Sequence, residues 1–450
     1  MLIFENATAV ALEPASVTEH CDIVCANGSI VELGLGVANG APERHGAKGE
    51  VTRIDADERI VMPGLVCGHN HLYSGLSRGI SVPLGPMPDF AHILENLWWR
   101  LDRSLTEDAI RVSAAVGILE AAASGTTTII DHHASAGSVR GSLGILAGEL
   151  ERVGVRGLLC YETSDRDGPE IKNAALAENE AFAERAAEAA AEARENGRPA
   201  PLLAAAIGGH ALFTLSEETL AEIASLTGRT GLGLHMHLGE DPIDREHAIE
   251  HHGMELTDRL LEHGLLDQNS ILVHGLHVSD RDREAINKAD AFLAHNTRSN
   301  MNNNVGYNQH LHELENWALG TDGIGSDMFT ESRFAFFKHR DAGGPLGLDG
   351  IAAGLSGAQR LASRHFGATI GTLAPGAACD LVMLDYRWPT PLLPENLAGH
   401  LVFGMQRADV NTVVVDGKVI YENRAFPFDV EPIYEESRRV ASELWKRMSR

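Results

Sequence analysis

The sequence predicts an α/β protein: a (β/α)8 TIM-like barrel with a small composite β-sandwich domain built from both ends of the chain. Two patterns lead to this prediction. Through the middle of the chain, eight short apolar runs alternate with helical stretches, which implies βαβ units and a closed parallel barrel. Near both ends, strand-like runs surround turn dipeptides, but neither end is long enough to bury a good core alone. A doubly wound open sheet remains an alternative for the middle, because a count of runs does not prove closure.

The two ends are expected to come together as one domain, formed by residues 1–60 and 372–430. Residues 22–31 contain two apolar runs around an Asn-Gly pair, which is a strong hairpin signal. Residues 380–385 and 410–420 contain further strand-like runs, the second with an Asp-Gly turn.

The barrel is expected to span residues 61–371 and to be followed, after the end domain, by a C-terminal helix over residues 431–450. Its strands are expected in chain order at residues 60–66, 126–130, 155–160, 202–207, 232–237, 270–274, 291–295 and 318–322. The stretch 178–195 is rich in Ala and Glu, which favours a solvated helix outside the barrel.

The composition excludes several classes of protein. The 450 residues are 44% hydrophobic and 22% charged, which is ordinary for a globular protein with a large core. The formal net charge of −26 argues against nucleic acid or an anionic membrane surface as the main partner. No apolar stretch reaches the about 18 residues of a membrane span, and the first residues lack the features of a secretion signal. The cytoplasm is the expected compartment. Five scattered Cys predict neither a thiolate zinc site nor a disulfide framework.

Polar side chains follow nearly every predicted strand. They are His69 and His71, Asp131, His210, His237 with Glu240, His274, His295 and Asp322. The C-terminal ends of barrel strands face the active site, so we expect these side chains to converge on one pocket.

A metal site is expected among these residues. Residues two apart in an extended chain point to the same side, so His69 and His71 can reach one ion. His237 and Asp322 on later strands would complete an imidazole and carboxylate set with an open position, where a bound water becomes more acidic. No Lys occurs between Lys172 and Lys288. The region after the fourth strand therefore cannot supply the modified Lys that often bridges two ions in such barrels, and a single ion is predicted.

Two further residues are candidates for proton transfer. Glu240 would lie on the loop after the fifth strand, where a carboxylate can take a proton from the water and pass it to a leaving group. The alternative is that Glu240 caps the next helix, because Asp241 and a proline follow it. His274 could orient the hydroxide or be a core histidine, and His235 could support a ligand or be structural.

Five motifs resemble the amidohydrolase superfamily: Gly64-Leu65-Val66-x-Gly68-His69-x-His71, His237-x-x-Glu240, His274-Gly275-Leu276-His277, His295-Asn296-x-x-Ser299-Asn300 and Thr321-Asp322-Gly323. Within it the chain is similar to the mononuclear deaminase and chlorohydrolase branch, which includes guanine, 8-oxoguanine and S-adenosylhomocysteine deaminases and triazine hydrolases. It most resembles the SsnA-type aminohydrolases linked to selenium metabolism, through residues 97–103, 131–135, 298–303 and 334–341.

This resemblance covers essentially the whole chain and implies a set of roles. It implies His69, His71, His237 and Asp322 as ligands of one divalent ion, Zn²⁺ or, as the alternative, Fe²⁺. It also implies Glu240 and His274 as the proton-handling pair, with Asp322 and His274 holding the hydroxide in line. The SsnA-type group brings no substrate with it.

Candidate substrate-binding residues follow from position alone. Trp98 and Arg100 lie in the long insertion after the first strand, where an aromatic wall would suit a flat heterocycle, although core packing would also explain them. The other candidates follow the second, fourth and seventh strands: His132, His210, Asn296 and Arg298. Each could instead hold its loop in place.

The predicted function is a metal-dependent hydrolase that replaces an amino group on a purine, pterin or pyrimidine-type ring by oxygen through a metal-activated hydroxide. It would be an aminohydrolase acting on C–N bonds of cyclic amidines, with a small heterocyclic substrate as its partner. One alternative is release of halide or alkylamine from a triazine-like ring. Another is a non-catalytic accessory protein of selenium-dependent hydroxylases, for which a broken ligand set or a missing Glu240 would be expected. A homodimer would fit the superfamily.

Overall fold

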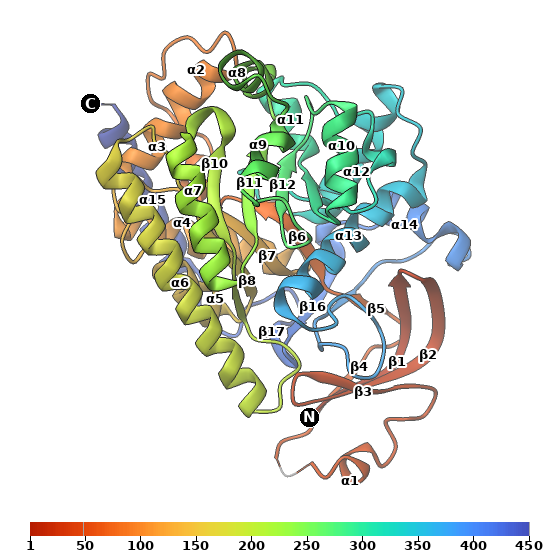
Figure 1. The fold of residues 1–450 in the computed structure, drawn as a ribbon. Coiled ribbons are helices and arrows are strands. Elements are labelled where there is room, and N and C mark those ends of the chain that lie inside the picture. Colours follow the sequence, from red (N-terminus) through yellow and green to blue (C-terminus); the bar gives the residue numbers. More distant parts are fainter. Residues whose placement is uncertain (48, 450) are drawn as a thin grey trace.

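The computed structural model describes residues 1–47 and 49–449, and it has two parts (Figure 1). A large α/β body carries helices around parallel strands, and a β-sheet formed by both ends of the chain packs below it. Among the described residues, no helix combines the length and the hydropathy that crossing a membrane requires.

The end sheet has eight strands in the order β17-β16-β15-β5-β1-β2-β3, with β4 paired to β1. They are β1 (Leu2–Leu12), β2 (Ala15–Ala26), β3 (Ser29–Gly34), β4 (Thr52–Asp55), β5 (Ile60–Pro63), β15 (Leu381–Leu384), β16 (Val410–Val415) and β17 (Lys418–Tyr421). The antiparallel pair β5 and β15 joins the strands of the two chain ends. Apolar residues of β1 to β5, β15 and β16 share one core, so the sheet encloses its own apolar face.

Both hairpin turns predicted from the sequence are present in this sheet. Asn27 and Gly28 have φ of 51° and 78° between β2 and β3, and Asp416 and Gly417 have φ of 53° and 70° between β16 and β17. Two successive positive φ angles match the right-handed twist of the flanking strands, which is why Asn-Gly and Asp-Gly are favoured there.

The barrel is formed by two parallel sheets, β6-β7-β8-β9 and β10-β11-β12-β13-β14. The strands are β6 (Leu65–Asn70), β7 (Thr126–His133), β8 (Arg156–Tyr161), β9 (Leu203–Ala205), β10 (Ile207–Ala211), β11 (Leu234–Leu238), β12 (Ile271–His274), β13 (Phe292–His295) and β14 (Trp317–Leu319). β9 lies within the fourth predicted strand, residues 202–207, and β10 begins at its last residue and continues to Ala211. The hydrogen-bond ladder is not continuous around the ring. Single parallel bridges, Thr163 with Gly209 and Asn70 with Asp322, join the two sheets at the two seams.

The first predicted strand is divided in the structure. β5 belongs to the end sheet and β6 to the barrel, and Gly64 lies between them. A Cβ atom at Gly64 would collide with the side chain of Thr127, so only glycine allows this close approach. The predicted boundary between residues 60 and 61 therefore falls inside β5.

Helices cover the outside of the barrel, and the long α6 runs along one side of it (Figure 1). The helices are α1 (Ala41–Arg44), α2 (Phe90–Ile93), α3 (Trp99–Ser104), α4 (Glu107–Ala123), α5 (Ser142–Val153), α6 (Pro169–Glu195), α7 (Glu217–Thr230), α8 (Pro242–His252), α9 (Leu256–Glu262), α10 (Asp280–Lys288), α11 (Thr297–Asn303), α12 (Met328–Asp341), α13 (Leu348–Phe366), α14 (Leu397–Phe403) and α15 (Glu431–Met448). Shorter turns are η1 (Leu72–Ser77), the π-helical η2 (Leu94–Trp98), η3 (Leu212–Thr214), η4 (Leu311–Glu313), η5 (Pro394–Asn396) and η6 (Arg407–Asp409).

Candidate active site

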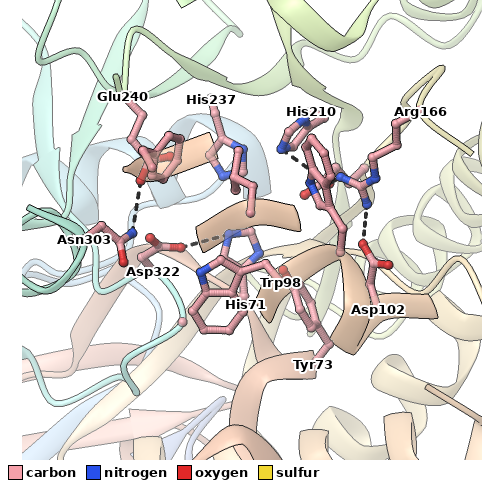
Figure 2. A pocket seen from close by; sticks show the side chains of 15 residues that line it. His71, Tyr73, Trp98, Asp102, Arg166, His210, His237, Glu240, Asn303 and Asp322 are labelled. Atoms are coloured by element: carbon pink, nitrogen blue, oxygen red, sulfur yellow. Dashed lines mark hydrogen bonds and ion pairs between the residues drawn. The ribbon is translucent and has the colours of Figure 1, made fainter. Parts of the chain in front are cut away.

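Four side chains predicted as metal ligands lie together at the C-terminal ends of the barrel strands. His69 comes from the end of β6, His71 from the residue directly after it, His237 from β11 and Asp322 from the residues after β14. One donor atom from each lies within 4.8 Å of the others, and all four residues are buried. Asp322 Oδ1 is 2.9 Å from His71 Nε2 and 3.7 Å from His69 Nε2. His71, His237 and Asp322 face one another across the pocket (Figure 2).

The chemistry of these donors fits a divalent cation. Burial lowers the pKa of His69 to about 3 and that of His237 well below its ordinary value, so both imidazoles are neutral, as metal ligands must be. Burial opposes the charge of Asp322, but His71 and His69 outweigh it and hold the pKa of Asp322 well below its ordinary value. Three imidazoles and one carboxylate form a set that Zn²⁺ accepts.

His71 Nε2 lies within ion-pair distance of Asp322 Oδ1, at 2.9 Å. Burial disfavours the charge of His71, but attraction and a hydrogen bond to Asp322 outweigh it and raise the pKa of His71 to about 9. A divalent cation beside Asp322 would replace the proton that His71 carries there, since ligand imidazoles bind metal in the neutral form.

The end of the eighth strand is fastened to the first. The N–H groups of Thr321 and Asp322 donate to the carbonyl of His69 at 2.9 and 3.0 Å. The side-chain amide of Asn70 donates to Thr321 Oγ1, to the carbonyl of Asp322 and to Ser326 Oγ, each at 3.1 Å. Asn70 and Thr321 therefore fix the position of Asp322 beside His69 and His71.

Glu240 and His274 form a second pair beside the four donors. His274 Nε2 lies 3.3 Å from Glu240 Oε2, and His274 Nδ1–H donates to Asn300 Oδ1 at 2.8 Å. The side-chain amide of Asn303 donates to Glu240 Oε1 at 3.3 Å. Burial first, and then the charge of Asp322, raise the pKa of Glu240 well above its ordinary value. A carboxyl group of this kind can carry a proton at neutral pH.

Glu240 does not cap the following helix, which was the alternative to a catalytic role. The N-cap of α8 is Asp241, whose side chain accepts a hydrogen bond from the N–H of Ile243. Glu240 instead lines the pocket together with Asn303 and Asp322 (Figure 2).

The pocket is a cleft with about 470 Å³ of space between its atoms, a volume that includes its opening to solvent. Of the predicted substrate-binding residues, Trp98 and His210 line it. Both are labelled in Figure 2, with the Trp98 indole beside His71. The remaining predicted substrate-binding residues are not among the described residues that line this cavity; they are Arg100, His132, Asn296 and Arg298.

Each of those four residues has another environment in the structure. Arg100 donates to the carbonyl of Pro83, and Arg298 pairs with the buried Glu331. The ring of His132 faces the carbonyls of Gly209 and His235 at 3.1 and 3.2 Å, and Asn296 is fully buried. The binding roles of all four stay predictions. The contacts of Arg100, His132 and Arg298 indicate that these three support the walls of the site, whereas the side-chain amide of Asn296 has no hydrogen-bond partner among the described residues.

Sequence reasoning missed a charged cluster at the other end of the cavity. Arg166 pairs with Asp102 and Glu162, and its guanidinium lies 5.3 Å from the ring of Trp99. Glu162 Oε1 is 3.8 Å from His210 Nε2. Burial raises the pKa of Asp102 to about 7, against the attraction of Arg166. The position of Glu162 directly after β8 follows the same strand-end rule that identified the histidines.

A (β/α)8 barrel with histidines and carboxylates gathered at the C-terminal ends of its strands defines a class of barrel hydrolases. The model of the amidohydrolase family matches residues 60–420, and the chain belongs to that family. It is an enzyme of the deaminase branch of the superfamily, as the sequence motifs predicted. The narrower resemblance to SsnA-type aminohydrolases stays a prediction.

Two relatives match almost the whole chain. The chain is 29% identical over 453 residues to the 5'-deoxyadenosine deaminase of Methanosarcina acetivorans, with 98% of each chain covered. It is 27% identical over 457 residues to the 5-methylthioadenosine/S-adenosylhomocysteine deaminase of Caldanaerobacter subterraneus subsp. tengcongensis, again with 98% of each covered.

Solved structures confirm the fold. An adenosine deaminase from Xanthomonas campestris with bound zinc matches with a TM-score of 0.80 and 21% identity, covering 99% of this chain and 98% of that one. The atrazine chlorohydrolase of Arthrobacter aurescens TC1 complexed with zinc matches with a TM-score of 0.81 and 20% identity, covering 98% and 100%. The barrel prediction is therefore confirmed, and the open-sheet alternative is set aside.

Proposed function

We propose that the chain is a zinc-dependent deaminase of an adenine-type nucleoside, in which water replaces the exocyclic amino group and ammonia leaves. The observation that carries this proposal is the Glu240–His274 pair, which lies beside four donors suited to one divalent ion. Glu240 lines the same cavity as three of these donors, His71, His237 and Asp322. The names of the two whole-chain relatives supply the substrate class, because both are deaminases of adenine nucleosides.

His69, His71, His237 and Asp322 would hold the ion. When bound, such an ion lowers the pKa of a water molecule and so supplies a nucleophile near neutral pH. Zinc is favoured by this donor set and by the zinc found in the structural neighbours, with Fe²⁺ as the alternative.

The proton is handled by the chain's own side chains. Glu240 would take the proton that the attacking water loses and deliver it to the departing amino group, so that water and the amine yield the oxo product and ammonia. Asn300 fixes the ring of His274 through Nδ1, which leaves Nε2 facing Glu240. His274 can therefore share that proton and orient the attacking oxygen.

The flat ring would lie against aromatic side chains. Trp98, Trp99 and Phe90 line the cavity together with His237 and Glu240, and apolar ring faces favour a planar heterocycle. From Glu240, the pocket extends toward Asp102 and Arg166 (Figure 2).

The test is ammonia release by zinc-loaded and iron-loaded protein on 5'-deoxyadenosine, 5-methylthioadenosine, adenosine and S-adenosylhomocysteine, with guanine, pterins and an aminotriazine for comparison. Halide release from a chlorotriazine is measured alongside. We expect ammonia from at least one adenine nucleoside. The Glu240→Gln variant should retain its metal and lose about 10²–10⁴-fold in kcat, the usual contribution of a general acid–base. The matched control is Glu246→Gln on the exposed surface of α8, which should keep full activity.

Other outcomes would replace the proposal. Halide release from a chlorotriazine without ammonia from any nucleoside would favour the alternative leaving group. Unchanged turnover in Glu240→Gln would refute the proton role of this residue. If the metal-loaded protein is inactive on every compound tested, the alternative of a non-catalytic accessory protein is favoured. The cytoplasmic location and the homodimer stay predictions.

A further inference from the structure

His69 differs from His71 in what holds the nitrogen that points away from the site. His71 Nδ1–H donates to a backbone carbonyl, that of His132. His69 Nδ1 lies 2.9 Å from another side chain, Nε2 of His235. Because a side chain can be exchanged and a carbonyl cannot, the contact of His69 can be tested by mutation.

The contact between the two imidazoles has one consistent proton arrangement. His69 Nε2 faces the other donors, at 3.3 Å from His237 Nε2 and 3.7 Å from Asp322 Oδ1, so it is the atom directed at the metal position. The proton of neutral His69 is then on Nδ1, and His235 Nε2 must accept it. The proton of neutral His235 is therefore on its own Nδ1.

The next partner accepts that second proton. His235 Nδ1 lies 3.5 Å from Cys160 Sγ, and Cys160 Sγ lies 3.7 Å from the carbonyl oxygen of Asp131. A thiol that donates to the carbonyl turns a sulfur lone pair toward His235. His69, His235 and Cys160 are each fully buried, so water does not compete for these contacts.

We propose that His235 is a positioning residue for His69, acting through a buried hydrogen-bond chain from His69 to His235, to Cys160 and to the carbonyl of Asp131. The proposal rests on the proposed function of His69 as a metal ligand. These hydrogen bonds fix the tautomer and the ring orientation of His69 before the ion binds. Partners of this kind hold metal-ligating histidines in the form that binds metal, and their loss typically lowers metal affinity about 10–100-fold.

The experiment measures zinc affinity of the full-length chain by competition with a chromophoric chelator. His235→Leu removes the acceptor at similar volume, and we expect zinc affinity to fall about 10–100-fold. His235→Gln places an amide oxygen near the position of Nε2 and should recover most of that loss. The matched control is His295→Leu, which removes an equally buried histidine of β13 that has no side-chain hydrogen bond among the described residues. Its zinc affinity should stay within about twofold of the unaltered chain.

A spectroscopic readout separates positioning from general loosening of the fold. The visible spectrum of the Co²⁺-loaded chain reports the ligand arrangement, and it should change in His235→Leu and return in His235→Gln. If His235→Leu does not fold, Cys160→Ala and Cys160→Ser provide the same comparison at the next residue of the hydrogen-bond chain. We expect Cys160→Ala to lower zinc affinity by less than His235→Leu would, and Cys160→Ser to recover it.

The outcomes for the two proposals are distinct. Zinc affinity and a Co²⁺ spectrum unchanged in His235→Leu, or in Cys160→Ala where that variant is used, would overturn the role of His235 and leave the deaminase proposal standing. Failure of the unaltered chain to bind zinc at His69 would overturn both. If zinc affinity falls in His235→Leu and is not recovered in a folded His235→Gln variant, the proposed hydrogen-bond chain is also rejected.

Discussion

At the scale of single residues, two candidate site residues adopt backbone conformations that L-amino acids disfavour. His274 and Asp322 have φ of 72° and 54°. Such conformations cost about 1–3 kcal/mol each and persist only where the surroundings impose them. The hydrogen bonds from Thr321 and Asp322 to His69 supply that constraint at the end of the eighth strand. Residue type at a strand end could be predicted from the sequence, but this local bend could not.

Asp244 is a residue on which the position of Glu240 depends. It accepts hydrogen bonds from the N–H of Gly239 at 2.8 Å and from the N–H of Phe213 at 3.1 Å. Burial raises the pKa of Asp244 from 3.8 to about 6 despite these bonds. The folded chain therefore binds this proton more tightly than the unfolded chain. The stability that Asp244 contributes is present at acid pH and is lost as the pH rises through that interval.

We therefore expect Asp244→Asn to change the pH dependence of unfolding. Relative to the unaltered chain, the variant should gain about 2–3 kcal/mol in the free energy of unfolding between about pH 4 and about pH 7. Urea unfolding at several pH values measures this difference. If the difference in the free energy of unfolding stays constant with pH, or if the unaltered chain gains stability relative to the variant as the pH rises, the raised pKa of Asp244 is contradicted.

At the scale of elements, Gly64 decides where one strand ends and the next begins. The run 60–66 was predicted as a single strand because both of its halves are apolar, although Pro63-Gly64 within it is a turn signal. The division into β5 and β6 arises from packing, because the backbone of Gly64 lies against Thr127. Hydrophobic patterns report burial, and both halves of this run are buried.

We expect Gly64→Ala to lower the free energy of unfolding by about 1–3 kcal/mol, the usual cost of overpacking a core. The matched control is Gly148→Ala within α5, where an added Cβ meets no atom within 4 Å. That change should be neutral or stabilise by up to about 1 kcal/mol, since alanine favours a helix interior. Thermal or urea unfolding distinguishes them, and an equal response of both variants would count against the steric explanation.

The strand-end rule predicted one side of the pocket better than the other. It located His69, His71, His237, Glu240, His274 and Asp322, because their spacing and residue types point to metal chemistry directly. It passed over Asp102 and Arg166, which come from α3 and from the loop after β8. Their importance lies in an ion pair between distant segments, and no local pattern in the sequence encodes such a pair.

At the scale of the whole molecule, a buried arginine joins the barrel to the end sheet. Arg156 of β8 is bidentate to Asp380, with its Nε 2.6 Å and its Nη2 3.0 Å from the carboxylate oxygens. It also donates to the carbonyls of Ala200 and Pro201. The composite end domain was predicted from chain length and turns, whereas this connection could be seen only in the structure.

Removing that arginine should destabilise both parts together. Arg156→Met leaves the buried Asp380 without its partner, and we expect a loss of about 3–5 kcal/mol in the free energy of unfolding. Arg229→Met is the control, because Arg229 and its partner Glu180 are both exposed and lie 2.8 Å apart, so its loss should cost at most about 1 kcal/mol. Urea unfolding followed by intrinsic fluorescence makes the comparison. A cost for Arg156→Met no larger than that of Arg229→Met would show that this ion pair is dispensable.

The seam between Asn70 and Asp322 joins residues that are 252 apart in the chain. The candidate ligands His69 and His71 lie on one side of that seam and Asp322 on the other. An ion held there would act as a reversible cross-link that closes a very long loop, much as a disulfide does. Loop closure restricts the unfolded chain more as the loop lengthens, although only logarithmically. The ion would also hold the two sheets together at this seam, where a single bridge replaces a continuous hydrogen-bond ladder. Removal of the metal should therefore speed amide hydrogen exchange first in β6 and β14, the two strands that meet there.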